Sequence, residues 1–177
     1  MKKVVILGVG NILLSDEGIG VKIVWELEKR FKFPEGVKLI DGGSGGFSLI
    51  PFIEEADRLL IIDAVLGNNP PGTIYRFTLE NLPETIAEKI SLHELSLTDI
   101  LNLVKLRKKL PEEIVIIGIE PASLEVSLEL SSEVKEKQEN LINMVLEELK
   151  KWGVFPEKKF QSSSSSDFKI NSSPETT

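Results

Sequence analysis

The sequence has 177 residues, of which 41% are hydrophobic, and this is enough apolar material for one core of ordinary size. A formal net charge of -7 argues against nucleic acid as a partner, because no positive field attracts a phosphate backbone. The chain has no cysteine, which excludes disulfides, thiolate metal ligands and a cysteine nucleophile. Any bound metal ion must therefore be held by oxygen or imidazole ligands.

The N-terminal segment joins two lysines to an apolar run that stops at Gly8, Gly10 and Asn11. A signal peptide has a longer apolar region, so a buried first strand explains this run better. No segment approaches the roughly 18 continuous apolar residues that a membrane span needs. We therefore expect no membrane insertion and a cytoplasmic location.

Predicted strands and helices alternate along the first part of the chain. Residues 3–8 form a β-branched run that predicts a strand, and residues 15–31 carry apolar side chains at helical spacing. Residues 37–40 predict a second strand, residues 47–53 a helix and residues 58–63 a third strand. Alternation of this kind predicts a parallel sheet covered by helices.

The second part of the chain completes the same architecture. Residues 73–77 predict a strand that follows Asp63 through a turn too short for a helical crossover, so we expect an antiparallel edge strand. A helix over residues 96–109, a strand over residues 114–119 and a helix over residues 132–152 follow. The predicted fold class is α/β, a three-layer α/β/α sandwich with a mostly parallel twisted sheet of about five strands.

The composition changes near residue 156. Residues 157–177 are rich in Ser, Lys and Thr and include five consecutive serines at 162–166. Such a segment buries too little apolar surface to offset the entropy of ordering. We expect one domain over residues 1–156 and a disordered tail over residues 157–177.

Acidic residues gather at the predicted carboxyl ends of the strands, where ligands bind in open α/β sheets. The acids that follow the predicted strands are Asp16 and Glu17, Asp41, Asp63, and Glu120. Packed acids are unfavourable unless a cation, a basic partner or a raised pKa relieves them, so a cation or proton site is expected. His93 is the only histidine and lies on a connection that can reach the same edge.

Each candidate also has a purely structural interpretation. Ser15 is a typical N-cap, with Asp16 and Glu17 in a first helical turn that favours acids. Asp63 can hydrogen-bond its own turn, and a single histidine is often a surface residue. Glycines at positions 18 and 20 are harder to explain, because each costs a helix about 1 kcal/mol relative to alanine. We infer that some group approaches this backbone closely.

Common nucleotide and hydrolase motifs are incomplete. Gly8 and Gly10 begin a dinucleotide-like loop, but Leu13 stands where the third glycine belongs. No P-loop and no Gly-x-Ser-x-Gly motif occurs, although residues 43–46 come near the latter. A nucleotide-binding regulatory domain stays an alternative.

Longer motifs resemble the nickel-iron hydrogenase maturation endopeptidases over nearly all of residues 1–155. The resemblance begins in residues 8–20 (GVGNILLSDEGIG) and continues in residues 41–44 (DGGS). It includes residues 61–64 (IIDA) and residues 91–99 (SLHELSLTD). The resemblance implies the same twisted sheet between helix layers, and it maps the metal-contacting residues onto Glu17, Asp63 and His93.

The resemblance also implies an activity. Members remove a C-terminal extension from the precursor of the [NiFe]-hydrogenase large subunit after nickel insertion, so this chain is expected to be a peptide-bond hydrolase. Nickel is expected to arrive with the substrate, and no organic cofactor is implied. Asp41, Gly42 and Gly43 would line the substrate cleft, and the group that activates water is left open. The alternative is a maturation factor that senses the metallocentre without hydrolysis.

Overall fold

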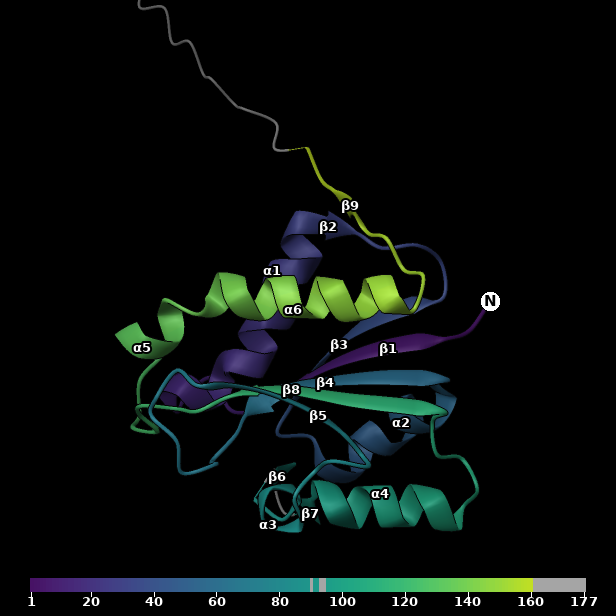
Figure 1. The fold of residues 1–177 in the computed structure, drawn as a ribbon, viewed down its shortest axis with the longest axis horizontal. Helices are drawn as coiled ribbons and strands as arrows, with labels where there is room; N and C mark the ends of the chain where they lie inside the picture. Colours follow the sequence, from purple (N-terminus) through teal and green to yellow (C-terminus); the bar gives the residue numbers. More distant parts are fainter. Residues whose placement is uncertain (90, 93–94, 161–177) are drawn as a thin grey trace, which may run out of the picture.

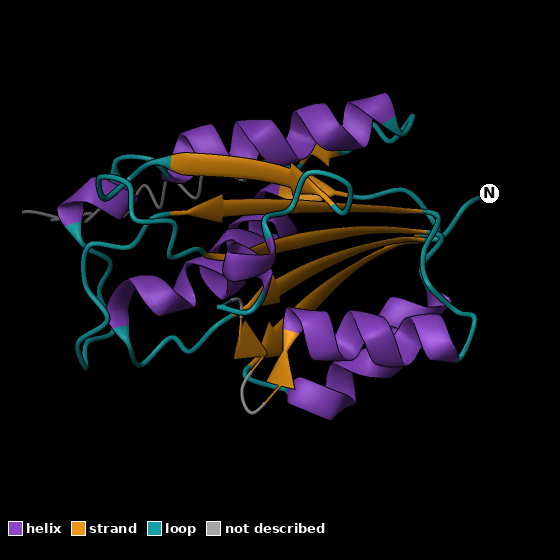
Figure 2. Cartoon of the chain, turned by 60° about the horizontal axis from the view of Figure 1, so that its bottom comes forward, coloured by secondary structure: helices purple, strands orange, loops and turns teal. Residues whose placement is uncertain are grey.

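The computed structural model describes residues 1–89, 91–92 and 95–160. Its centre is a five-stranded sheet in the order β3-β1-β4-β8-β5. The strands are β1 (Val4–Val9), β3 (Val37–Gly43), β4 (Arg58–Ala64), β5 (Ile74–Thr78) and β8 (Glu113–Ile119). All pairs are parallel except β5 with β8, which is antiparallel. Figure 2 shows this edge strand pointing against its neighbours, as the short turn before it predicted.

Helices cover both faces of the sheet (Figure 1). The long helices α1 (Ile19–Arg30) and α6 (Gln138–Lys151) lie on one face, and α2 (Ile50–Glu55) and α4 (Leu97–Leu106) lie on the other. Each face has its own cluster of buried hydrophobic residues. The predicted three-layer α/β/α sandwich is confirmed.

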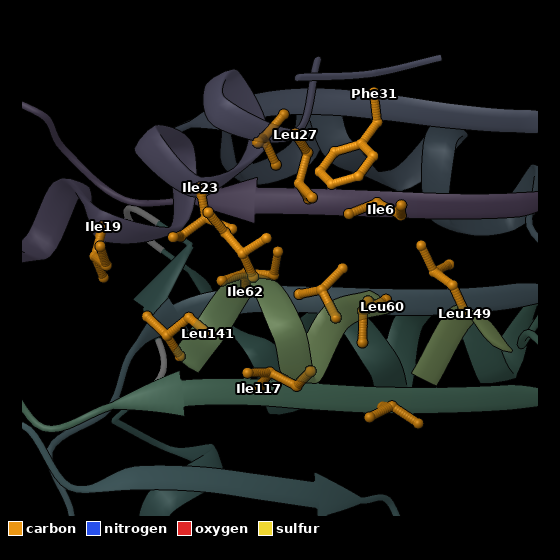
Figure 3. Packing of buried hydrophobic residues seen from close by; sticks show 14 of the residues in the cluster. Ile6, Ile19, Ile23, Leu27, Phe31, Leu60, Ile62, Ile117, Leu141 and Leu149 are labelled. Carbon is orange, nitrogen blue, oxygen red and sulfur yellow. The ribbon is translucent and has the colours of Figure 1, made fainter. Parts of the chain in front are cut away.

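The three inner strands, β1, β4 and β8, are nearly continuous apolar runs because both of their faces are buried. Along β4, Leu60 and Ile62 pack against α1 and α6 (Figure 3), while Leu59 and Ile61 pack against α2 and α4. These four side chains have no exposed surface. Full burial of such a side chain contributes about 1.5–3 kcal/mol, so this alternation anchors both helix layers to one strand.

Glycines let the start of α1 lie directly on the strand ends. A Cβ atom at Gly20 would be 2.1 Å from the carbonyl oxygen of Ile62, and one at Gly8 would be 2.3 Å from the carbonyl oxygen of Gly20. A Cβ at Gly18 would be 2.6 Å from the Cα of Ile12. The close approach predicted from these glycines is confirmed, and the approaching group is the backbone of the protein itself.

The first turn of the predicted helix over residues 15–31 has a different form. Residues Ser15–Gly18 form a 3-10 helix, η1, and α1 begins only at Ile19. The prediction that Ser15 is an N-cap is wrong, because its hydroxyl donates to the carbonyl oxygen of Glu129 at 2.8 Å and caps no helix. Its φ of 52° lies in the left-handed region, which tertiary contacts must stabilise.

The predicted final helix is divided in two. Helix α5 (Ser132–Lys135) ends before α6 begins at Gln138. Neither glycine nor proline occurs at the break, so the local sequence does not indicate it. The N-cap of α5 is Ser131, whose side chain and backbone are bound to Asp16. The position of α5 is therefore set by a tertiary contact.

Short elements complete the chain: β2 (Phe31–Lys32), η2 (Gly46–Leu49), α3 (Glu84–Ala87), β6 (Ser91–Leu92), β7 (Leu95–Ser96) and β9 (Glu157–Lys158). Strand β9 belongs to the predicted tail but pairs with β2. Residues 161–177 lie outside the described residues, where the disordered tail stays a prediction. Among the helices of the described ranges, none has the length and apolar composition needed to cross a membrane.

The strand order identifies the place where a site is favoured. From β1 the chain passes through α1 to β3 on one side of β1, whereas β4 lies on the other side. The connections after β1 and β4 therefore diverge, which leaves a crevice at their carboxyl ends. Ligands of open α/β sheets bind at such a position.

Candidate active site at the carboxyl edge of the sheet

Glu17 and Asp63 line one pocket at this crevice. Glu17 belongs to η1, directly before α1, and Asp63 is the penultimate residue of β4. The pocket has a volume of about 190 Å³, and Lys89, Pro121 and Leu124 contribute to its walls. Two of the three predicted metal-contacting residues are therefore brought together by the fold.

Asp63 is a buried carboxylate with little hydrogen-bonding support. It is only 5% exposed, and among the described residues its single hydrogen-bond donor is the backbone N–H of Ala64, at 2.7 Å from Oδ1. Burial raises the pKa of Asp63 well above its usual range, and the negative charge of Glu17 raises it further. The Ala64 N–H acts in the opposite direction but does not compensate for burial.

Glu17 is less buried than Asp63, but its pKa is shifted in the same direction. Partial burial raises the pKa of the Glu17 carboxyl above its ordinary value. None of the ion pairs within the described parts of the chain involves Glu17 or Asp63. Two acids that have raised pKa values and form no ion pair with a described residue can share a proton or bind a cation.

Asp16 has a structural role that differs from that of its neighbour. Its side chain is fully buried and accepts hydrogen bonds from the backbone of Ala122 at 2.9 Å and of Ser123 at 3.0 Å. It also accepts from the backbone N–H of Ser131 at 2.8 Å and from its hydroxyl at 2.7 Å. Asp16 thus holds residues 122–131 against η1, and this segment includes Leu124, which lines the same pocket as Glu17.

His93, the third predicted ligand, lies outside the described residues. Lys89, four positions before His93 in the sequence, lines the pocket, so the chain reaches the pocket shortly before His93. Strands β6 and β7, on either side of His93 in the sequence, pair antiparallel with Leu92 opposite Leu95. Within the described ranges, no three His, Asp or Glu side chains lie close enough to hold a metal ion. The chain has no cysteine, so a metal ion in this pocket would need oxygen or imidazole ligands, and Glu17 and Asp63 supply carboxylate oxygens.

Asp41 lies at the same edge of the sheet but lines a different pocket. It is two strands away from Asp63, with β1 between them. Its pocket includes Trp25 of α1 and Gly43. Gly42 is buried, and a Cβ atom there would be 2.9 Å from a methyl group of Leu7. The fold therefore does not bring Asp41 into the pocket of Glu17 and Asp63.

Two other predicted features have structural explanations. Glu120 is buried and accepts hydrogen bonds from the Gly67 N–H at 2.7 Å and the Tyr75 hydroxyl at 2.9 Å, which holds the turn before β5. The dinucleotide-like loop is filled by the protein, because a Cβ atom at Gly10 would be 1.7 Å from the carbonyl oxygen of Glu17. These glycines accommodate η1, which removes the main argument for a nucleotide site.

Sequence reasoning missed Lys89, Pro121, Leu124 and Trp25 as lining residues. One local signal was available for the segment that contains Leu124. Apolar residues alternate with polar ones at positions 124, 126 and 128, and all three side chains are exposed. An exposed strand-like alternation without a covering layer indicates a segment with a role at the surface.

Comparison with known proteins identifies the family. The family described as hydrogenase maturation protease (HycI) matches residues 21–148. The hydrogenase 2 maturation protease of Escherichia coli (strain K12) is 38% identical over 153 residues, which are 86% of this chain and 93% of that protein. The hydrogenase expression/formation protein HoxM of Cupriavidus necator is 37% identical over 155 residues, which are 86% of this chain and 77% of that protein.

Solved structures agree with the sequence relatives. The hydrogenase maturating endopeptidase HybD from E. coli has a TM-score of 0.83 and 37% identity, and the match covers 89% of this chain and 98% of that chain. The [NiFe] hydrogenase maturation protease HybD from Thermococcus kodakarensis has a TM-score of 0.64 and 30% identity, with 83% of this chain and 98% of that chain covered. The chain belongs to the hydrogenase maturation protease family and is a hydrolase, as its motifs implied.

Proposed function

We propose that this chain removes a C-terminal extension from the nickel-loaded precursor of a [NiFe]-hydrogenase large subunit, in the cytoplasm. Glu17, Asp63 and His93 contact the nickel that the precursor carries. The observation that supports this most strongly is the shared pocket of Glu17 and Asp63 at the switch point of the sheet. Membership of the hydrogenase maturation protease family supports the reaction class.

The chemistry of the pocket suits a cation that arrives from outside. Two carboxylates and one imidazole fill only part of the coordination shell of a divalent ion, which leaves positions for ligands of the precursor or for water. Burial raises the pKa of Asp63 and of Glu17, so the empty pocket favours protons. Binding of the nickel centre displaces these protons, because coordinating carboxylates must be ionised.

Hydrolysis follows from positioning. Contact with the nickel places the scissile peptide bond over the edge of the sheet, where it is held near the pocket. A pocket carboxylate or water on the nickel then assists the attack on the peptide carbonyl. Asp41, Gly42 and Gly43 line the path of the substrate along the same edge. Nickel in this scheme is part of the substrate and signals that the precursor is complete.

The test is to incubate the protein with the nickel-loaded precursor and with the nickel-free precursor and to weigh both products by intact-mass spectrometry. We expect a single C-terminal fragment to be lost, and only from the nickel-loaded form. As a positive control, a relative of known activity must process its own precursor under the same conditions. An unchanged mass of the nickel-loaded precursor in that setting would overturn the proposal.

Variants of the pocket test the roles of its residues. Asp63→Asn, Glu17→Gln and His93→Ala should each abolish processing without lowering the midpoint of thermal unfolding. Glu147→Gln is the matched control, because it removes one acid from an exposed position of α6, on a helix layer away from the pocket. A pocket variant that processes the precursor at the parent rate would remove that residue from the proposed set.

A further inference from the structure

The pocket beside Asp41 contains an unusual pairing of an exposed aromatic ring with a carboxylate. This pocket has a volume of about 240 Å³ and is lined by Trp25, Asp41, Gly43 and residues 10–12, among others. Trp25 is 42% exposed, although it belongs to α1, which covers one face of the sheet together with α6. Asp41 is the only charged residue among the described residues that line the pocket.

Two neutral donors hold the Asp41 carboxylate in place. The indole N–H of Trp25 donates to Oδ2 at 2.9 Å, and the backbone N–H of Gly43 donates to Oδ1 at 3.0 Å. A carboxylate has about four lone-pair sites, so further donors can be accepted. None of the ion pairs between described residues involves Asp41. The negative charge is oriented but not neutralised by a basic side chain of the described chain.

The same protein contains a second indole–carboxylate pair, and that one is completed by an arginine. At the opposite end of the sheet, the indole N–H of Trp152 donates to Glu113 at 2.8 Å. The guanidinium of Arg58 lies 5.9 Å from the centre of the Trp152 ring, and its Nε is 3.3 Å from a Glu113 oxygen. One cation thus satisfies both the ring and the carboxylate. The pair of Trp25 and Asp41 is the same arrangement without a cation among the described residues.

We propose that the Trp25 and Asp41 pocket is a subsite for a basic side chain of the peptide substrate, with arginine preferred over lysine. This inference rests on the proposed function, which supplies a peptide as the substrate and a bound group at Asp63 from which the position of the basic residue is counted. A cation over an indole ring is attracted by the π-electrons, and a neighbouring carboxylate adds a charged partner. Arginine is favoured because its planar group stacks on a ring and binds a carboxylate through two N–H groups.

The distance along the sheet edge indicates which substrate residue would be bound. Asp41 and Ile62 both pair with Gly8, so two strand spacings, about 10 Å, separate their backbones. Asp63 follows Ile62 directly, and an extended peptide advances about 3.3 Å per residue. The basic residue should therefore lie roughly three to five residues from the group that is bound at Asp63.

The first test measures binding without any proteolysis. N-acetyl-arginine amide, N-acetyl-lysine amide and the uncharged N-acetyl-norleucine amide are titrated into the full chain, and the Trp25 indole N–H and Gly43 amide N–H signals are followed by NMR. We expect saturable shifts that are stronger with the arginine probe than with the lysine probe and absent with norleucine. The Trp152 indole signal is the internal control, because Arg58 already occupies that pair.

Asp41→Asn separates charge recognition from shape, because asparagine keeps the size of the side chain and loses its charge. The Trp25 shift should then disappear, while Glu147→Gln should leave it unchanged. A Trp25 signal that does not shift with the arginine probe, or that shifts equally in Asp41→Asn, would overturn the proposal. This outcome does not depend on whether the protein processes a hydrogenase precursor.

The second test uses the precursor. Each Arg or Lys within five residues of the precursor's nickel ligands is replaced by methionine, and KM is measured with the parent and with Asp41→Asn. One replacement should raise the apparent KM for the parent by about 3- to 10-fold, and it should have no additional effect in Asp41→Asn. Independent losses in the two proteins would contradict the subsite. If the parent cleaves no precursor, the proposed function fails and the titration alone decides the subsite.

Discussion

Two buried aspartates lie at the same edge of the sheet, and they differ in how their burial is compensated. Asp16 is 0% exposed, and its oxygens accept hydrogen bonds from three backbone N–H groups and one hydroxyl. Asp63 is 5% exposed, and among the described residues only the Ala64 N–H donates to it, while Glu17 adds a second negative charge nearby.

The two aspartates differ in whether hydrogen bonds from described residues compensate for their burial. A buried carboxylate is tolerated when hydrogen bonds replace the water it has lost, and Asp16 meets this condition within the chain. Among the described residues Asp63 meets it only poorly, which favours a protonated carboxyl or a bound cation. Substitution and titration of these acids test this difference, beginning with the largest expected effect.

Asp16→Ala should be the most destabilising of these changes. It removes the buried acceptor of the partly buried hydrogen bonds from the backbone N–H groups of Ala122, Ser123 and Ser131, which hold residues 122–131 against η1. We expect the free energy of unfolding to fall by roughly 3–5 kcal/mol, measured by urea titration with two optical probes. Asp16→Asn is the control and should lose less, because one acceptor oxygen remains. A loss below about 1 kcal/mol in Asp16→Ala would show that the contact is not required.

Asp63→Asn should change stability in the opposite direction. The amide keeps the oxygen that accepts from Ala64 but cannot become a buried charge. We expect the free energy of unfolding at neutral pH to rise by about 1–3 kcal/mol while processing is lost. Measurement of unfolding and of precursor mass on the same preparation links the two effects. A variant that is less stable than the parent would assign Asp63 to the group of structural acids.

The pH dependence of stability should carry the signature of Asp63. The folded pKa of Asp63 lies well above the ordinary aspartate value of 3.8, so at a pH between these two values the folded state holds a proton that the unfolded state has released. The free energy of unfolding of the parent therefore falls as pH rises through this window, by up to about 1.4 kcal/mol per pH unit. Asp63→Asn cannot titrate at this position, so the difference in the free energy of unfolding between the two proteins should grow with pH and then level off. A difference that is constant with pH would contradict the raised pKa.

Glu17→Gln should have the smallest effect. It removes the negative charge that raises the pKa of Asp63, but burial is the larger cause and remains. The pKa of Asp63 should therefore move down and still lie above its ordinary value. A ¹³C NMR titration of the Asp63 carboxyl group measures this directly. An unchanged Asp63 titration would show that the two carboxyls do not interact in solution.

Much of the fold was predictable because its signals are local. The inner strands β1, β4 and β8 are short apolar runs, which predict buried strands. The turn before β5 is too short for a helical crossover, which predicts that β5 is antiparallel to its neighbour. The start of α1 was predicted too early, since nothing in residues 15–18 distinguishes a 3-10 turn from an α-helical one. The break between α5 and α6 has no local signal either, because Ser131 is held by a residue far away in the sequence.

The sequence alone determined the alternation of elements, the family motifs and the expectation that acids meet at one edge of the sheet. The tertiary structure decided how deeply each acid is buried there and which groups donate hydrogen bonds to it. Asp16 and Glu17 are adjacent in the chain, yet the donors to Asp16 come from residues 106 to 115 positions later. Burial and hydrogen bonding of a carboxylate depend on such distant groups, so no local pattern separates Asp16 from Glu17. The same holds for Asp41, which lies in β3 and accepts a hydrogen bond from Trp25 of α1.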